Sequence, residues 1–272
     1  MPEDRPSYHP DVLVARDGHR ATVTLNRPET KNACTGDMWV AIGATFRDLA
    51  TSGARVIVLT GAGGDFCAGA DLSGVAARKT SGTGPAAPGN NLDGMRVLGD
   101  VVMALHDCPV PVIARVDGVC VGAGLGLALA ADMVWCSDRA RFCAIFAKRG
   151  LSLDFGTSWL LRQRIGVHRA KELAFTARMV GAPEALSLGL VNAVVPADEL
   201  DAATAEIATA VAAGPPIALS LMKRELDHAG QSSLAQALEA EAMAQSVNVR
   251  TEDSREAFMA YAERRPPNFS GT

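Results

Sequence analysis

The sequence predicts an α/β fold that is followed by a helical C-terminal region. Short runs of β-branched residues, including 55–60 and 111–116, alternate with helical patterns through the first part of the chain. From residue 157 onwards strand patterns become scarce and helical patterns dominate. Alternating strands and helices are typical of one α/β core, so we expect a core over residues 1–195 and a helical region over 196–272.

The first elements follow from local patterns. Residues 11–15 and 21–25 alternate polar and apolar side chains on either side of a turn at Gly18, which predicts a β-hairpin. Apolar residues recur at helical spacing from Trp39, so residues 36–50 are expected to form an amphipathic helix. The next predicted elements are helices 95–107 and 123–131 and strands 133–137 and 140–143.

The later part of the chain is predicted to be mainly helical. The expected helices are 157–164, 168–177, 198–213, 216–228, 233–247 and 252–264, with one strand near 190–195. Before them, residues 79–94 are rich in Gly, Pro, Ser and Asn, which predicts a flexible loop where a mobile substrate cover would lie. A solvated insertion without a role explains this composition equally well.

Composition limits the classes of partner. A chain of 272 residues with net charge −4 and pI near 5.8 gives no electrostatic case for nucleic acid or an anionic membrane. The charged N-terminus lacks the apolar core of a signal peptide. Residues 119–136 are apolar but are interrupted by Asp132 and fall short of the ~20 residues of a membrane span. Six cysteines without a Cys-x-x-Cys pair predict reduced, buried thiols in the cytoplasm.

Several familiar motifs are not matched. The glycines at 122, 124 and 126 lack the spacing of a dinucleotide-binding loop, and no strand ending in an acid follows at the required distance. There is no phosphate-loop lysine, and the Ser-x-x-Lys match at Ser220–Lys223 falls inside a helical pattern without its usual partner motifs. The five histidines are scattered, so no metal site is expected.

Two glycine-rich runs, residues 64–72 and 118–126, indicate chemistry. Each follows a β-branched strand, so small residues there expose backbone N–H groups. Two such donors can stabilise an oxygen that becomes negative during a reaction, which suggests an oxyanion hole. The second run contains no acid or base before Asp132, so the group that transfers a proton must come from elsewhere in the chain.

Ordered motifs then give a family resemblance. The segments are Thr24–Pro28, Asn32-Ala33, Phe66–Leu72, Asp117-Gly118 and Gly122–Gly124. From about residue 12 to Phe269 the chain resembles the crotonase (enoyl-CoA hydratase/isomerase) superfamily. The resemblance implies a spiral of ββα units, with a helical C-terminal region that serves trimerisation and covers the pocket. It also implies homotrimers or hexamers built as dimers of trimers. The implied ligand is an acyl-CoA thioester, with no metal or redox cofactor because coenzyme A enters with the substrate.

The resemblance also implies roles for single residues. The two oxyanion donors fall on the N–H groups of Ala70 and Ala123, and the carbonyl that contacts adenine falls on Ala68. Asp71 is expected to bond its own turn within the substrate-binding segment, and Phe146 to line the acyl pocket. The other implied substrate-binding residues are Lys31, Gly69, Leu72, Gly122 and Arg264. Arg264 would reach the CoA phosphate of a neighbouring subunit, although a solvated charge is the favoured explanation for both Lys31 and Arg264.

The acids decide which reaction is expected. The two glutamates that activate water in hydratases of this family fall on Gly126 and Phe146, and neither side chain can accept a proton. Asp154 lies in a segment, 150–159, that resembles the proton-shuttling aspartate segment of family isomerases, although Leu153 replaces the usual proline. The alternative for Asp154 is that it caps the helix beginning near residues 156–157.

Three functions remain open from the sequence. The first is double-bond isomerisation of an enoyl-CoA or ring-type acyl-CoA, through a thioester enolate, with Asp154 as proton shuttle. The second is an enoyl-CoA hydratase of fatty-acid degradation (β-oxidation) with a non-standard acid and base set. The third is a non-catalytic acyl-CoA-binding protein that kept the pocket and lost the reaction.

Overall fold

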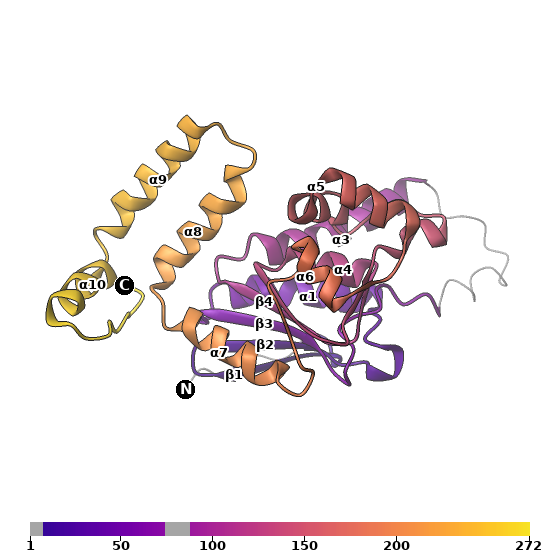
Figure 1. Ribbon diagram of the computed structural model, residues 1–272, viewed down its shortest axis with the longest axis horizontal. Coiled ribbons are helices and arrows are strands. Elements are labelled where there is room, and N and C mark those ends of the chain that lie inside the picture. Colours follow the sequence, from indigo (N-terminus) through magenta and orange to yellow (C-terminus); the bar gives the residue numbers. More distant parts are fainter. Residues whose placement is uncertain (1–7, 74–87) are drawn as a thin grey trace.

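A six-stranded sheet forms the centre of the computed structural model, which describes residues 8–73 and 88–272 (Figure 1). Its strands are β1 (Val12–Asp17), β2 (Arg20–Leu25), β3 (Val56–Gly61), β4 (Val112–Val116), β6 (Met133–Ser137) and β9 (Ala193–Val195). They lie in the order β1-β2-β3-β4-β6-β9. The β1–β2 hairpin is antiparallel, whereas every later pair in this sheet is parallel.

A second, smaller sheet has three short strands. They are β5 (Val119–Val121), β7 (Arg141–Cys143) and β8 (Val180–Gly181). β5 follows β4 after only two residues, and it pairs in parallel with β7, which pairs antiparallel with β8. The chain therefore leaves the central sheet directly after β4 and enters the smaller sheet beside it.

Helices cover both faces of the central sheet. Because side chains alternate along a strand, Ile57 and Leu59 of β3 point into the main core, whereas Val56 and Val58 point to the opposite face. The main core is closed by α1 (Gly36–Leu49), α3 (Pro88–His106) and α4 (Ala123–Ala130). The opposite face is covered by α7 (Leu200–Ala212), which buries Ala208 against it.

Further short elements complete the body of the molecule. They are the 3-10 helices η1 (Pro28–Thr30) and η2 (Ile145–Arg149), and the helices α5 (Thr157–Thr176) and α6 (Ala182–Leu188). α5 is interrupted at Gly166, whose φ of 76° and ψ of 164° are not helical. The two helices expected at 157–164 and 168–177 are therefore the two halves of α5, separated by this break.

The last three helices form an arm that stands off the body (Figure 1). They are α8 (Pro216–Ala229), α9 (Leu234–Asn248) and α10 (Glu252–Glu263). α8 and α9 pack side by side, and α8 is tied to the body where Lys223 Nζ lies 3.0 Å from Asp132 Oδ2. The Asp132 oxygen also accepts the Val112 N–H at 2.6 Å, so one partly buried carboxylate joins the arm to β4.

The predicted α/β class and the β-hairpin are confirmed, one local expectation was wrong, and two elements were missed. α3 begins at Pro88, so residues 88–94 of the expected loop 79–94 are helical, while 79–87 lie outside the described residues. β5 was missed because it lies within the second glycine-rich run. α6 was missed although Pro183 near its start and Gly189 after its end are typical helix boundaries. The division at residue 195 stays a prediction.

Two further expectations concern thiols and membranes. All six cysteines are free and buried, as expected from their positions in apolar segments. Within residues 8–73 and 88–272, no single helix is long and apolar enough to cross a membrane. Among these described residues, only α7 and α8 taken together reach that length and composition, and they are bent by 105° relative to each other.

Candidate active site

The two glycine-rich runs lie side by side in register. The Cys67 N–H donates to the Val119 carbonyl at 2.9 Å, and the Val121 N–H donates to the Cys67 carbonyl at 3.0 Å. This parallel pairing sets Cys67 opposite Cys120. Ala70 and Ala123 each come three residues later, so both chains carry them to the same end of the pairing.

Glycine lets the two turns approach each other closely. Gly69 has φ of +96°, and a Cβ atom there would lie 3.4 Å from the Ala123 nitrogen and 3.0 Å from the Val121 carbonyl oxygen. Gly122 has φ of +60°, a conformation that L-residues rarely adopt, and it turns the chain directly into α4. No side chain therefore separates the Ala70 and Ala123 turns.

Both predicted oxyanion donors are free to bind a ligand. Ala123 is the first residue of α4, so its N–H points out of the helix and carries the positive end of the helix dipole. On either side of Ala70, Cys34 N–H bonds Gly69 O and Asp71 N–H bonds Cys34 O, each at 2.8–2.9 Å. Neither the Ala70 nor the Ala123 N–H has an acceptor among the described residues.

A buried asparagine holds the first turn in place. Asn32 is fully buried, accepts the Arg27 N–H at 2.9 Å, and donates to the carbonyls of Ala62 and Asp65 at 2.8 and 2.7 Å. Asn32 belongs to the motifs that carry the family resemblance, but no role was predicted for it. Its amide supplies both donor and acceptor, which is what fixing two unpaired loop segments requires.

Asp71 bonds its own turn, as expected. Its Oδ1 accepts the Ser73 N–H at 2.9 Å, and its Oδ2 accepts Arg27 Nη1 at 2.8 Å. Hydrogen bonds from Ser73, and then from Arg27, lower the pKa of Asp71 to about 2. The carboxylate is thus ionised and engaged by protein groups.

The rest of the predicted substrate-binding segment surrounds the same turn. The Ala68 N–H donates to the Lys31 carbonyl at 2.9 Å, so the loop after η1 packs directly on the turn that carries Ala70. The Lys31 side chain is exposed, and so is Leu72. The Ala68 carbonyl accepts no hydrogen bond from the described residues, which leaves it open to a ligand.

Apolar groups occupy the other side of the second turn. Phe146 is buried in the main core within η2. Its neighbour Ile145 was not singled out from the sequence, yet its Cγ2 atom would lie 3.3 Å from a Cβ at Gly122. Ile145 therefore provides an apolar contact beside the second turn, and no role was predicted for it from the sequence.

Gly126 packs against the segment that carries Asp154. A Cβ atom at Gly126 would lie 2.4 Å from the Phe155 carbonyl oxygen and 2.8 Å from the Phe155 Cβ. Gly126 is one helical turn after Ala123, so this contact places the Asp154-Phe155 segment against the first turn of α4. The structure thus places the segment that carries Asp154 near the end of α4 where Ala123, the second predicted oxyanion donor, lies.

The alternative role of Asp154 as a helix cap is wrong. α5 begins after Gly156, and no side chain accepts a hydrogen bond from its first turn. Asp154 contributes only its carbonyl oxygen, which accepts the Thr157 N–H at 3.0 Å. Its Oδ1 is buried without a hydrogen-bond partner. Burial raises the pKa of the Asp154 carboxyl above its ordinary value, since the charged form is poorly solvated there.

Arg264 does not reach this site within its own chain. It follows α10 in a left-handed conformation at the end of the arm, and α10 makes no extensive contact with the body (Figure 1). Its expected contact with the CoA of a neighbouring subunit stays a prediction.

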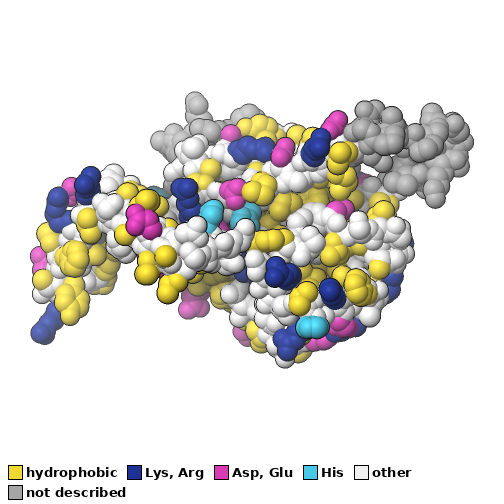
Figure 2. Space-filling view, turned by 90° about the horizontal axis from the view of Figure 1, so that it is seen from above, with side chains coloured by type: hydrophobic (Ala, Val, Ile, Leu, Met, Phe, Trp, Pro, Cys, Tyr) yellow, Lys and Arg dark blue, Asp and Glu magenta, His cyan; other side chains and the backbone are white. Residues whose placement is uncertain are grey.

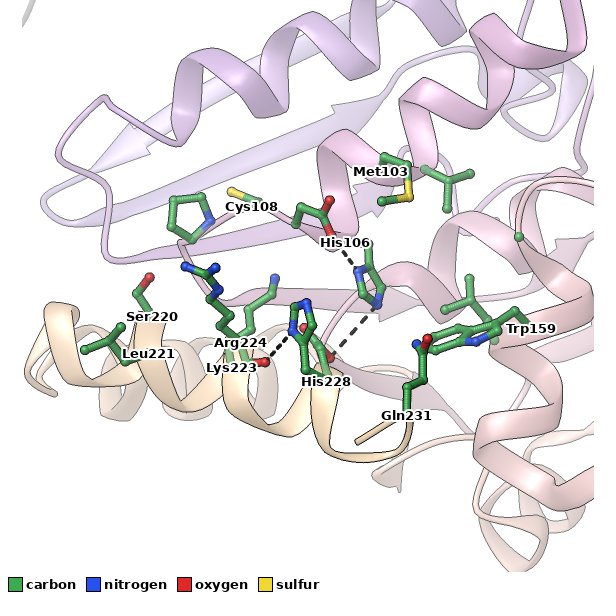
Figure 3. A pocket seen from close by; sticks show the side chains of 16 residues that line it. Met103, His106, Cys108, Trp159, Ser220, Leu221, Lys223, Arg224, His228 and Gln231 are labelled. Atoms are coloured by element: carbon green, nitrogen blue, oxygen red, sulfur yellow. Dashed lines mark hydrogen bonds and ion pairs between the residues drawn. The ribbon is translucent and has the colours of Figure 1, made fainter. Parts of the chain in front are cut away.

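A separate cavity of about 800 Å³ borders the segment after Asp154 (Figure 3). It lies between α3, the start of α5 and α8, and Gly156 and Trp159 form part of its wall. His106 Nδ1 lies 2.9 Å from Asp107 Oδ1 and its ring packs edge-on against Trp159, at 5.7 Å between centroids. None of the residues predicted from the sequence to bind substrate lines this cavity.

A metal site is not found in the part of the chain that the structure describes: no group of three or more His, Cys, Asp or Glu side chains is arranged to hold a metal ion there. The expectation that the reaction needs no metal or redox cofactor stays a prediction.

Comparisons with known proteins agree with this geometry. The family model described as enoyl-CoA hydratase/isomerase matches residues 18–272. A Rhodobacter capsulatus protein named "Probable enoyl-CoA hydratase" is 38% identical over 270 residues, 97% of this chain and 99% of that protein. The Escherichia coli 1,2-epoxyphenylacetyl-CoA isomerase is 35% identical over 251 residues, 92% of this chain and 94% of that protein.

A solved structure extends the likeness to the whole fold. The crystal structure of a protein assigned as an enoyl-CoA hydratase from Streptomyces coelicolor superimposes with a TM-score of 0.90 at 34% identity, and the match covers 100% of both chains. The relatives thus carry both hydratase and isomerase names. With its paired turns, free donors and matching family model, this chain belongs to the enoyl-CoA hydratase/isomerase family of acyl-CoA enzymes.

Proposed function

We propose that this protein isomerises the double bond of an enoyl-CoA or ring-type acyl-CoA thioester, with Asp154 as the proton shuttle. The single observation that carries the proposal is the Asp154 carboxylate itself. It is half-buried, unpartnered at Oδ1, and attached to the segment that packs on the first turn of α4. Gly126 and Phe146, where two water-activating glutamates are expected in hydratases of the family, offer no acid or base.

The chemistry uses one carboxylate twice. The N–H groups of Ala70 and Ala123 bind the thioester carbonyl oxygen and stabilise the negative charge that develops on it. Asp154 takes a proton from C2 of a 3-enoyl-CoA, which gives a conjugated dienolate, and then returns that proton to C4. The product is the 2-enoyl-CoA, and no water is added or lost. A carboxyl with a raised pKa suits this work because it must both accept and release the proton.

The proposal is tested by offering the purified protein 3-enoyl-CoA and 2-enoyl-CoA in parallel. We expect conversion of the 3-enoyl into the 2-enoyl thioester, with no 3-hydroxyacyl-CoA from either substrate. Rapid formation of 3-hydroxyacyl-CoA from the 2-enoyl thioester would instead support the hydratase alternative. Tight binding of acyl-CoA without turnover of either substrate would support the binding-protein alternative.

The pH dependence follows from the direction of the Asp154 shift. Burial raises the pKa of this carboxyl above the usual value of about 3.9, and only the ionised form can take the first proton. The value of kcat/KM should therefore fall as the pH drops through a pKa above that of an ordinary aspartate. Because the folded-state pKa is raised, the contribution of Asp154 to folding stability is present at low pH and lost as the pH rises through that pKa. A pH–rate profile with an acid limb at or below the ordinary value would contradict this assignment.

We also propose that the protein assembles into trimers or hexamers through the arm. Figure 2 shows hydrophobic side chains spread over this region. Leu226, Phe258 and Tyr261 are 77%, 74% and 87% exposed. Large apolar side chains that are exposed together on one part of a molecule are typical of a protein–protein interface. Light scattering should give about three or six times the chain mass of 28.3 kDa. A monomeric mass would contradict the proposal.

A further inference from the structure

The backbone after Asp154 adopts an unfavourable conformation that contacts with the rest of the molecule must stabilise. Phe155 has φ of +51° and Gly156 has φ of +69°, so two consecutive residues are in the left-handed region. A non-glycine residue is disfavoured there because its Cβ crowds the backbone. Such a conformation persists only where the surroundings impose it, and it is common at functional sites.

The Phe155 side chain supplies one constraint. It is buried, and its ring centroid lies 4.4 Å from that of Trp39, with the two rings tilted by 51°. Trp39 is itself buried in α1, which packs against α3 in the main core. The ring therefore anchors the segment to the main core.

Gly126 supplies the second constraint. A Cβ atom at Gly126 would lie 2.4 Å from the Phe155 carbonyl oxygen, 2.8 Å from its Cβ and 3.0 Å from Thr157 Oγ1. The Phe155 carbonyl oxygen is a backbone atom and the Phe155 Cβ is bonded directly to the backbone, so a change of side-chain rotamer cannot move either atom out of the way. Any side chain at position 126 therefore displaces Phe155, and with it the adjacent Asp154.

The Asp154 carboxylate has no comparable support of its own. Its Oδ1 is buried without a hydrogen bond, and Gly156 rather than Asp154 precedes α5 as the cap. Hydrogen bonds normally fix a catalytic carboxylate. Here the direction of Asp154 depends instead on the backbone that Phe155 and Gly156 set.

We infer that Phe155 is the positioning residue of the Asp154 carboxylate, locked between the Trp39 ring and a position 126 that has to be glycine. This inference rests on the proposed function, because it assigns a purpose to the placement of the proton shuttle. It also bears on which reaction the site can perform. Phe155 occupies the space next to Gly126, so an acidic side chain at position 126 and the Asp154 segment in its present position exclude each other.

The test compares two glycine-to-alanine variants in helices. Gly126→Ala should lower kcat for 3-enoyl-CoA isomerisation by about tenfold or more, because a small misplacement of a reacting group is costly. The KM for the substrate should stay within about twofold, since Ala70 and Ala123 still bind the thioester. The matched control is Gly99→Ala in α3, where a Cβ would meet no atom within 4 Å. We expect this control to keep the activity of the unmodified protein.

A second readout does not depend on turnover. Displacing Phe155 should admit water to the Asp154 carboxyl, so its pKa, followed by carbon NMR of the labelled side chain, should move down toward the ordinary aspartate value in Gly126→Ala and not in Gly99→Ala. Phe155→Leu, which keeps an apolar side chain but loses the ring contact to Trp39, should shift kcat and this pKa in the same direction. If Gly126→Ala does not fold, Phe155→Leu provides the test in its place.

The outcomes separate the two proposals. If the unmodified protein does not isomerise 3-enoyl-CoA, the proposed function fails while the pKa comparison still tests the positioning role. If the unmodified protein is active but Gly126→Ala and Phe155→Leu leave kcat and the Asp154 pKa unchanged, Phe155 does not position Asp154. An equal loss in Gly99→Ala would also overturn the inference.

Discussion

Replacing Asp154 by asparagine should lower the rate of enoyl-CoA isomerisation by about 10²- to 10⁴-fold, the usual contribution of a positioned general acid or base. Asparagine has nearly the shape of aspartate but cannot accept the C2 proton. Acyl-CoA binding should survive, because it depends on the backbone donors Ala70 and Ala123 and on the turns that present them. The loss should therefore fall on kcat rather than on KM.

The same substitution should leave the fold intact. Asp154 makes no side-chain hydrogen bond through its buried Oδ1, and its pKa is raised by burial, so the folded state holds its charged form at a cost. A neutral amide removes that cost. Thermal unfolding near neutral pH should thus occur at the same temperature as for the unmodified protein, or slightly higher.

The control for this experiment is a surface aspartate. Asp138 is exposed and lies after β6, and Asp138→Asn should keep full activity. Conversion of 3-enoyl-CoA to 2-enoyl-CoA is followed by the absorbance of the conjugated thioester, and acyl-CoA affinity is measured by calorimetry. Isomerisation that persists at its original rate in Asp154→Asn would remove Asp154 from the mechanism and reopen the search for the base.

The paired turns were predictable because their determinants are local. Strand 55–60 and strand 111–116 were recognised by β-branched residues, and the glycines after them predicted exposed N–H groups. The structure confirms both strands within one residue at each end and places the two turns in register. The family resemblance then assigned Ala70 and Ala123, whose unpaired N–H groups are consistent with that role.

The support around the candidate acid could not be predicted, because it depends on contacts between distant segments. Nothing in the sequence around Phe155 indicates a left-handed conformation, which arises from packing against Trp39, more than a hundred residues earlier. Gly126 was interpreted only as a missing acid, whereas its lack of a side chain is what admits Phe155. The strand β5 was not predicted for a different reason: its three residues, which lie between two glycines, are too few to show a periodicity.

Replacing Gly124 by alanine should damage stability and catalysis together. A Cβ atom at this position would lie 2.4 Å from the Cys67 carbonyl oxygen and 2.8 Å from the Cys67 Cβ. That carbonyl accepts the Val121 N–H, so the backbone of one turn would be pushed away from the backbone of the other. Alanine is a better helix former than glycine by ~1 kcal/mol at most, whereas overpacking costs about 1–3 kcal/mol, so the clash prevails.

The catalytic loss has the same origin as the loss of stability. Gly124 lies next to Ala123, and Cys67 begins the turn that presents Ala70. The Gly69 N–H donates to Cys67 Sγ at 3.4 Å, and this hydrogen bond helps to fix the shape of that turn. Separating Gly124 from Cys67 therefore separates the two donors from each other. Losing the alignment of one oxyanion donor costs about 10²- to 10³-fold in kcat.

Thermal unfolding and steady-state kinetics of Gly124→Ala measure both effects. The matched control is Gly94→Ala in α3, where a Cβ would meet no atom within 4 Å and helix propensity predicts unchanged or slightly higher stability. The two effects differ in their response to temperature: lowering it refolds an unstable variant, but it cannot restore the spacing of the donors. If Gly124→Ala recovers full kcat at a temperature where it is wholly folded, the contact between Gly124 and Cys67 serves stability alone, and the oxyanion geometry does not depend on it.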